Sequence, residues 1–275
     1  MRSGGQRGFT LVEMIVVIVI TGILGSMVAV FIKLPVQQYF DVARRTDLTD
    51  IANLALSRLE SDLRSALPHS ARQISATCPG GSGTCSFLEF LPSSGSGRYR
   101  NGTGGTGNIL TIGVADTSFE VLGAMPIFAA GDQIIVTDNT VTAAYDANYR
   151  TSYGSTAPPT IVNIASIAFP LPGNPGARFH VINQAVSYVC DPAGGTLMRY
   201  SYAIQAAQPT TAAALGAGRL LANHVSSCSF DVTAINGSPG NSLVAISLVV
   251  SKKHETLDLS DTVTLYKVVH VSNEP

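Results

Sequence analysis

The pattern of apolar and polar positions changes twice along this chain, and its first part is almost continuously apolar. From Phe9 to Ile32 only Glu13 carries a formal charge. A helix of this length covers roughly 36 Å, which is enough to cross the hydrocarbon core of a bilayer. We therefore predict a transmembrane helix over residues 9–34, preceded by a short polar leader at residues 1–8.

A one-sided helical pattern continues beyond this segment. Between Pro35 and Leu67, apolar residues recur at steps of three to five, which is typical of a helix with one buried face. Residues 9–67 thus predict a single spine of about 89 Å if unbroken. Pro35 lacks a backbone donor and is expected to kink or loosen the helix.

The periodicity of residues 68–275 is strand-like. Short β-prone runs are bounded by Gly, Pro, Asn and Asp, which predicts a globular head of mainly antiparallel sheet. The predicted fold class is therefore α+β, with a long N-terminal helical spine packed on this head. The expected strands are Ser86–Leu91, Asn108–Val114, Gln133–Thr137, Ile161–Ile167, Ala185–Cys190, Leu197–Tyr202, Val225–Val232, Leu243–Val250 and Thr262–Val271.

Turn chemistry indicates how some of these strands connect. Asp191-Pro192-Ala193-Gly194 has the residue preferences of a type I turn and predicts a hairpin between its flanking strands. The last two predicted strands form a second hairpin. Residues 92–107 are too polar and too rich in glycine to pack a core, so we expect a mobile loop there. Residues 145–159 are expected to form another loop.

Arg2 and Arg7 on the short leader favour its retention in the cytoplasm, which places the head outside. Four cysteines in an oxidising compartment predict disulfides, for which three pairings are possible. We favour Cys78–Cys85 with Cys190–Cys228, because the first pair encloses a turn-rich segment and the second lies on two predicted strands. Metal binding by four thiolates is disfavoured, since the short paired spacings are absent.

Catalysis and nucleic-acid binding find little support in the composition. His69, His180, His224, His254 and His270 are scattered, and neither a Gly-x-Ser-x-Gly nor a His-Glu-x-x-His motif occurs. The formal net charge is −1, and loss of the leader would make it more negative. We expect no enzyme activity, cofactor, metal or nucleic-acid partner.

The segment Gly8-Phe9-Thr10-Leu11-Val12-Glu13 resembles the processing motif of type IV pilins and type II secretion pseudopilins. The resemblance implies that a prepilin peptidase and methyltransferase cuts after Gly8 and N-methylates Phe9. It also implies that Glu13 attracts the N-terminus of an incoming subunit. The alternative is that Glu13 pairs with its own amine and with the N-terminal dipole of its helix.

Further blocks resemble the minor pilin O group of the mannose-sensitive haemagglutinin (MSHA) pilus system, among them Pro35–Asp41, Asp62–Pro68 and Val186–Cys190. This likeness implies a non-enzymatic minor pilin that initiates or caps an MSHA-type pilus. Its partners would be major and other minor pilins, the inner-membrane assembly platform and membrane lipid. It would cross a Gram-negative inner membrane once, with a periplasmic head, before incorporation into a surface pilus. The alternatives are a type II secretion pseudopilin resembling the J component, and a pilus-tip adhesin.

Overall fold

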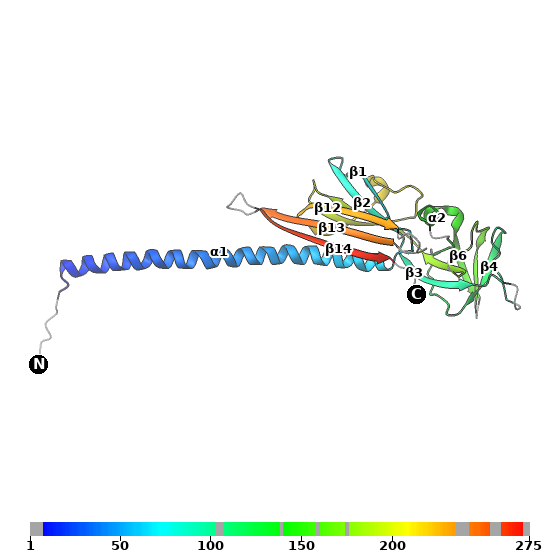
Figure 1. The fold of residues 1–275 in the computed structure, drawn as a ribbon, viewed down its shortest axis with the longest axis horizontal. Coiled ribbons are helices and arrows are strands. Elements are labelled where there is room, and N and C mark those ends of the chain that lie inside the picture. The colour runs from blue at the N-terminus through cyan, green and yellow to red at the C-terminus, as the bar shows by residue number, and fades with distance from the viewer. Residues whose placement is uncertain are drawn as a thin grey trace, which may run out of the picture. The chain divides into compact units, whose positions relative to one another are not determined.

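A computed structural model describes residues 8–102, 107–137, 140–157, 160–173, 176–234, 242–253 and 260–271. The chain divides into two compact units, Met1–Asp47 and Leu48–Pro275. The fold is α+β, with a long N-terminal apolar helix and mostly antiparallel sheet after it, which confirms the predicted class (Figure 1).

Helix α1 runs from Leu11 to Arg64 and continues through Pro35. These bounds lie within two or three residues of the predicted ones, as is usual for helix ends. A kink at Pro35 stays a prediction. The second unit begins within α1, at Leu48. The predicted bounds of the head, residues 68–275, stay a prediction.

The second unit contains two open antiparallel sheets. The five-stranded sheet has the order β1-β2-β9-β10-β11, and the three-stranded sheet has the order β12-β13-β14. Both predicted hairpins, β9–β10 and β13–β14, are confirmed by their antiparallel pairing. The strands are β1 Arg72–Thr77, β2 Thr84–Phe90, β9 Ala185–Asp191, β10 Thr196–Tyr202, β11 Arg219–Asn223, β12 Val225–Ala234, β13 Ser242–Lys253 and β14 Ser260–Val271.

Both open sheets pack on the last turns of α1. The buried stripe of the helix includes Leu48, Leu56, Leu59 and Leu63, which are at most 3% exposed. These side chains share one apolar core with residues of both sheets, such as Ile246 on β13. The three- and four-residue steps read from the sequence therefore correspond to a helix face that is buried in the head.

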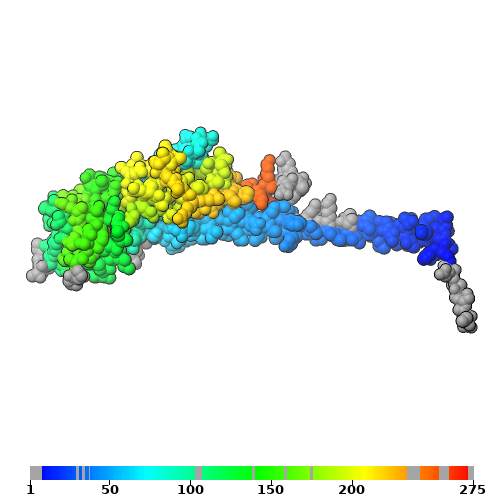
Figure 2. Space-filling view, turned by 180° about the vertical axis from the view of Figure 1, so that it is seen from behind, coloured from blue at the N-terminus to red at the C-terminus, as the bar shows by residue number. Residues whose placement is uncertain are grey.

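Between β2 and β9 the chain builds a separate closed barrel. β2 and β9 are direct neighbours, with Phe90 opposite Val186. The residues between them form six strands in the order β3-β4-β7-β6-β5-β8. The barrel is therefore an insertion into one strand pair of the head, and its residues are largely green in Figure 2. Its strands are β3 Ser93–Tyr99, β4 Asp116–Leu122, β5 Gln133–Ile135, β6 Arg150–Ala157, β7 Ile161–Ile167 and β8 Arg178–Ile182.

The barrel has an aromatic core of its own. Phe119 contacts Tyr99 and Phe179 edge to face, with ring centroids 6.3 and 5.1 Å apart, and all three rings are fully buried. Helix α2, Val141–Tyr145, and the short 3-10 helix η1, Ala147–Tyr149, connect β5 to β6. The remaining short helix, α3, covers Ala212–Leu215 and precedes β11.

The barrel corrects the expected loop at residues 92–107. Ser93–Tyr99 is strand β3, and residues 103–106 lie outside the described part. Glycine permits close packing here, because a Cβ on Gly97 would lie 2.7 Å from the Phe179 ring. The glycines that suggested mobility therefore let β3 approach a buried aromatic side chain.

Two further expectations about this region were wrong. Most of the expected loop at residues 145–159 is helix η1 and strand β6, while residues 158–159 lie outside the described part. Conversely, the expected strand Asn108–Val114 is irregular. Its backbone is still bonded, since the Leu110 and Gly113 N–H groups donate to the Arg100 and Phe169 carbonyls over 2.9 Å each.

Candidate functional site

The Gly8–Phe9 junction is open on both sides. A Cβ built on Gly8 meets no atom within 4 Å, and Phe9 is 79% exposed. Neither residue is helical, because α1 begins at Leu11. The geometry therefore leaves this peptide bond accessible to an enzyme.

The Thr10 side chain caps the N-terminus of α1. The Glu13 N–H donates to Thr10 Oγ1 over 3.3 Å, and the Met14 N–H donates to the Thr10 carbonyl over 3.2 Å. Thr10-Leu11-Val12-Glu13 has the S/T-x-x-E pattern of a capping box. This role of Thr10 was not predicted above, although the pattern is readable in the sequence. Glu13 itself is exposed in the first turn, where the helix dipole favours a negative charge.

The helix that follows presents an apolar surface. Leu11–Val28 has a mean hydropathy of 2.5, and none of these residues is buried within the chain. The hydroxyls of Thr21 and Ser26 donate to carbonyls of the preceding turn, at 2.7 and 2.8 Å. These polar groups are therefore satisfied within the helix, as a lipid environment requires.

The head carries two disulfides, Cys78–Cys85 and Cys190–Cys228, with Cα atoms 4.9 and 6.4 Å apart. This is the pairing favoured from the sequence. The first closes the turn between β1 and β2. The second joins β9 of the five-stranded sheet to β12 of the three-stranded sheet, so it fixes the two sheets to one another.

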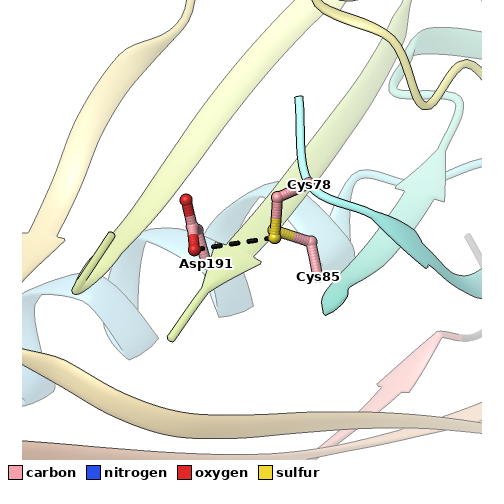
Figure 3. Close-up of side chains that lie close together, drawn as sticks. All are labelled: Cys78, Cys85 and Asp191. Carbon is pink, nitrogen blue, oxygen red and sulfur yellow. Dashed lines mark hydrogen bonds between the residues drawn. A yellow bond between two sulfur atoms is a disulfide. The ribbon is translucent and has the colours of Figure 1, made fainter. Parts of the chain in front are cut away.

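Figure 3 shows the one cluster of potential metal ligands among the described residues, Cys78, Cys85 and Asp191. Cys78 Sγ lies 3.6 Å from Asp191 Oδ1. Both sulfur atoms belong to the disulfide, so neither is the thiolate that a metal binds. This cluster is therefore a covalently closed turn beside a carboxylate.

The described histidines do not form a ligand set. Burial lowers the pKa of His180, on β8 of the barrel, to about 4, so its imidazole is neutral at pH 7. His69 and His224 both have the left-handed backbone conformation, with φ at 58°. His254 lies outside the described residues.

A buried ion pair lies where the barrel meets the five-stranded sheet. Arg72 on β1 donates to both carboxylate oxygens of Glu89 on β2, at 3.1 Å from Nη2, and Glu89 is fully covered. The Arg72 guanidinium also lies 3.5 Å from the ring centroid of Tyr145, on α2 of the inserted segment. Burial raises the pKa of Glu89 to about 7. Together, Arg72, Glu89 and Tyr145 link the inserted segment to the five-stranded sheet.

The comparisons with known proteins bear on the N-terminus. Residues 4–29 match a family model described as a prokaryotic N-terminal methylation motif. No curated protein and no solved structure matches the chain. The matched residues include the exposed junction, the capping box and most of the apolar helix.

The motif and the apolar helix together support a type IV pilin-like protein, either a pilin or a pseudopilin subunit. Subunits with this motif are structural proteins rather than enzymes. The motif implies processing by a prepilin peptidase and assembly with other pilins. The helix suggests membrane anchoring, as in pilins.

Proposed function

We propose that this chain is a minor pilin that helps to initiate or cap an MSHA-type type IV pilus. The observation that carries the proposal is the order of features at the N-terminus. An accessible Gly8–Phe9 bond is followed by a capped helix with an uncovered apolar surface. The same helix continues to Arg64, and its residues Leu56, Leu59 and Leu63 lie in the core of the head. The MSHA assignment is supported by the sequence blocks near Pro35, Asp62 and Val186.

Cleavage after Gly8 would create a positive amine on Phe9. An amine and a carboxylate about 4 Å apart gain roughly 4 kcal/mol at an effective dielectric near 20, before desolvation is subtracted. Glu13 is exposed and near the head of its helix, so it is accessible to the amine of an incoming subunit. In our proposal Glu13 recruits that subunit.

Glu13→Gln tests recruitment separately from helix capping. Glutamine can still serve in a capping box but carries no charge. We expect normal membrane abundance and reduced cross-linking to neighbouring pilins. Thr10→Val is the matched control, because it removes the capping hydroxyl and keeps the charge. Unchanged cross-linking in Glu13→Gln, or an equal loss in Thr10→Val, would reject a recruiting role for the charge.

A small number of copies is supported by the inserted barrel. In a helical filament every repeating subunit makes the same contacts, so a bulky insertion would have to fit at each step. A subunit at one end, or in an initiating complex, has no such restriction. The accessible Phe9 and the exposed Glu13 still provide the groups needed to engage a neighbour.

A type II secretion pseudopilin resembling the J component is the second candidate, because the same processing motif serves both systems. Deletion of the gene separates the two. A minor pilin predicts few surface filaments, with the major pilin still processed in the membrane. A pseudopilin predicts normal filament number and loss of a secreted enzyme from the medium.

The proposed processing has a direct test of its own. Intact-mass analysis of the chain extracted from peptidase-positive cells should give a species that begins at methylated Phe9. A bulky residue at Gly8 should leave the leader attached. A wild-type chain that still begins at Met1 in such cells would contradict the proposal.

A further inference from the structure

The part of α1 that follows the apolar span carries an exposed apolar stripe. Val36, Tyr39 and Phe40 are 46%, 71% and 56% exposed, and all three lie in the first compact unit. Their spacing of three and four residues places them on one face of the helix. The Tyr39 and Phe40 rings contact one another edge to face, with centroids 5.8 Å apart. Within the described part of the chain, these side chains are therefore largely uncovered.

The position of this stripe along α1 places it just beyond a bilayer core. From Glu13 to Ile32 the helix rises by about 28 Å, which matches a hydrocarbon core of about 30 Å. A carboxylate is costly at the centre of a bilayer and less so near its edge, so Glu13 marks one boundary of the core. Tyr39 lies about 11 Å beyond Ile32. Interfacial layers of about 5–8 Å flank the core, so the stripe begins within one layer and ends near its outer limit.

Side-chain direction brings the two rings back toward the membrane. Helical side chains lean toward the N-terminus and cover the preceding turn. The rings of Tyr39 and Phe40 therefore lie nearer to the hydrocarbon core than their own Cα atoms do. A tilt of about 20°, the average for membrane helices, shortens the distance along the membrane normal further. Both effects place the rings in the interfacial layer.

Charged residues begin directly after the aromatic pair. Five of residues 41–50 are charged, and Asp41 forms an ion pair with Arg44. Such groups are costly in hydrocarbon, so α1 leaves the bilayer near Asp41. Tyr39 and Phe40 are the last aromatic residues of α1. Aromatic rings are enriched at this level of membrane proteins, because an apolar ring with a polar edge suits a partly hydrated layer.

Lipid accounts for this exposed stripe more simply than a protein partner does. The stripe continues the uncovered apolar surface of Leu11–Val28, which a membrane covers in every anchored copy. Two aromatic side chains bury about 150–250 Å² each. A stable protein interface buries at least about 1,200 Å², so a partner would also need contacts away from the stripe.

We propose that Tyr39 and Phe40 form an aromatic anchor in the lipid headgroup layer at the C-terminal end of the membrane span. The Tyr39 hydroxyl faces headgroup oxygens and water, while both rings and Val36 cover the adjoining ends of the acyl chains. The anchor limits how far α1 slides along the membrane normal, and so sets the level at which the charged segment leaves the bilayer. The inference rests on membrane anchoring and applies equally to a pilus subunit and a secretion subunit.

The first test measures the depth of position 39 in a bilayer. The chain contains no tryptophan, so a single introduced tryptophan reports its own position. Full-length Tyr39→Trp is reconstituted in phosphatidylcholine vesicles at high lipid excess, with Ile23→Trp as the deep reference. Thr46→Trp is the matched control, because Thr46 is exposed and lies two turns beyond Tyr39 on the same face. Quenching is measured with lipids brominated near the headgroup end or near the methyl end of their acyl chains.

Tyr39→Trp should be quenched more by the shallow bromines than by the deep ones, and its emission should lie to the blue of Thr46→Trp. Ile23→Trp should show the reverse depth preference. A Tyr39→Trp that is unquenched and emits like Thr46→Trp would overturn the proposal. So would a blue shift that occurs only at high protein-to-lipid ratio, because a second copy would then cover the ring. An unquenched Ile23→Trp would overturn the proposal together with the anchoring on which it depends.

The second test examines the native rings themselves. Val36→Trp reports the depth of the stripe while Tyr39 and Phe40 are still present. Adding Tyr39→Ser and Phe40→Ser should shift its emission to the red, because the helix loses its anchor and position 36 becomes more hydrated. Val42→Ser in the same background is the control, since Val42 is 65% exposed but lies off the stripe. An unchanged emission in the double-serine variant, or an equal shift with Val42→Ser, would contradict the anchoring role.

Discussion

The Arg199 guanidinium on β10 donates through Nε to Asp62 Oδ2 on α1 over 2.7 Å, which ties the spine helix to the five-stranded sheet. The Tyr188 hydroxyl on β9 donates to the same oxygen over 2.9 Å. Asp62 is buried, so its charge depends on these partners for stabilisation. The helix is thus held on the head by a specific polar contact as well as by its leucines.

Asp62→Ala should destabilise the head, because it leaves the Arg199 guanidinium and the Tyr188 hydroxyl without their acceptor. We expect a loss of about 3 kcal/mol in the free energy of unfolding, measured by urea titration of the chain in micelles. Asp50→Ala, at an exposed position of the same helix, should change stability by less than about 0.5 kcal/mol. Equal effects of the two substitutions would show that the contact is not stabilising.

The pH dependence of stability should carry a contribution from Glu89. Burial raises its pKa from 4.5 to about 7, against the opposing effect of Arg72. Between these two pH values the folded chain binds the proton more tightly than the unfolded chain. Glu89 therefore makes its full contribution to the free energy of unfolding below pH 4.5, and this contribution is lost as the pH rises through 7. The loss is at most about 3 kcal/mol.

The measurement compares wild type with Glu89→Gln in urea titrations between pH 4.5 and 7.5. Subtracting the two curves removes other titrating groups, including buried His180, whose lowered pKa gives the opposite trend. The wild type should lose stability relative to the variant as the pH rises. Glu120→Gln serves as the control, since Arg100 lowers the pKa of that carboxyl. Parallel wild-type and Glu89→Gln curves would contradict the assignment.

Close packing in the barrel makes Gly97 sensitive to substitution. A Cβ at this position would lie 2.7 Å from the ring of buried Phe179, and overpacking of this kind costs about 1–3 kcal/mol. Gly97→Ala should lower the unfolding midpoint and alter the near-ultraviolet circular dichroism of the aromatic side chains. Gly80→Ala is the control, because a Cβ there meets nothing within 4 Å. An unchanged unfolding midpoint in Gly97→Ala would argue against the packing of β3 on the barrel core.

The two disulfides should contribute unequally. Their sequence separations are 38 residues for Cys190–Cys228 and 7 for Cys78–Cys85. Loop-closure entropy predicts about 4 and about 2 kcal/mol respectively. Unfolding of the two double-alanine variants measures these losses, and non-reducing peptide mapping checks the pairing. A larger loss from Cys78/Cys85 removal would reverse the expected order.

Local signals in the sequence were sufficient for the helix and both hairpins. The stripe that contains Leu48 and Leu59 predicted the buried helix face, and the turn after Asp191 predicted the β9–β10 hairpin. Each signal acts between residues that are close in sequence, so it can be read without knowing the rest of the fold. The capping-box pattern of Thr10 and Glu13 is also local, so it could have been predicted from the sequence.

The barrel and the ion pair at its base depend on contacts between distant residues. In the sequence alone, Gly97 indicates a mobile segment. Only the fold shows that Phe179 lies beside it. Likewise, nothing in the local sequence around Arg72 indicates that Tyr145 covers its guanidinium. Strand pairing of this kind is decided by tertiary packing, which overrides the local preference of a polar, glycine-rich segment.

The central claim is that this chain is a pilus subunit present in few copies, and quantitative immunoblotting of sheared, purified filaments tests it most directly. Purified standards of this chain and of the major pilin calibrate the ratio. We predict that this chain is present in the filament fraction, begins at Phe9, and is far less abundant than the major pilin. Near-equal amounts of the two proteins, or absence of this chain from the filaments, would contradict the account.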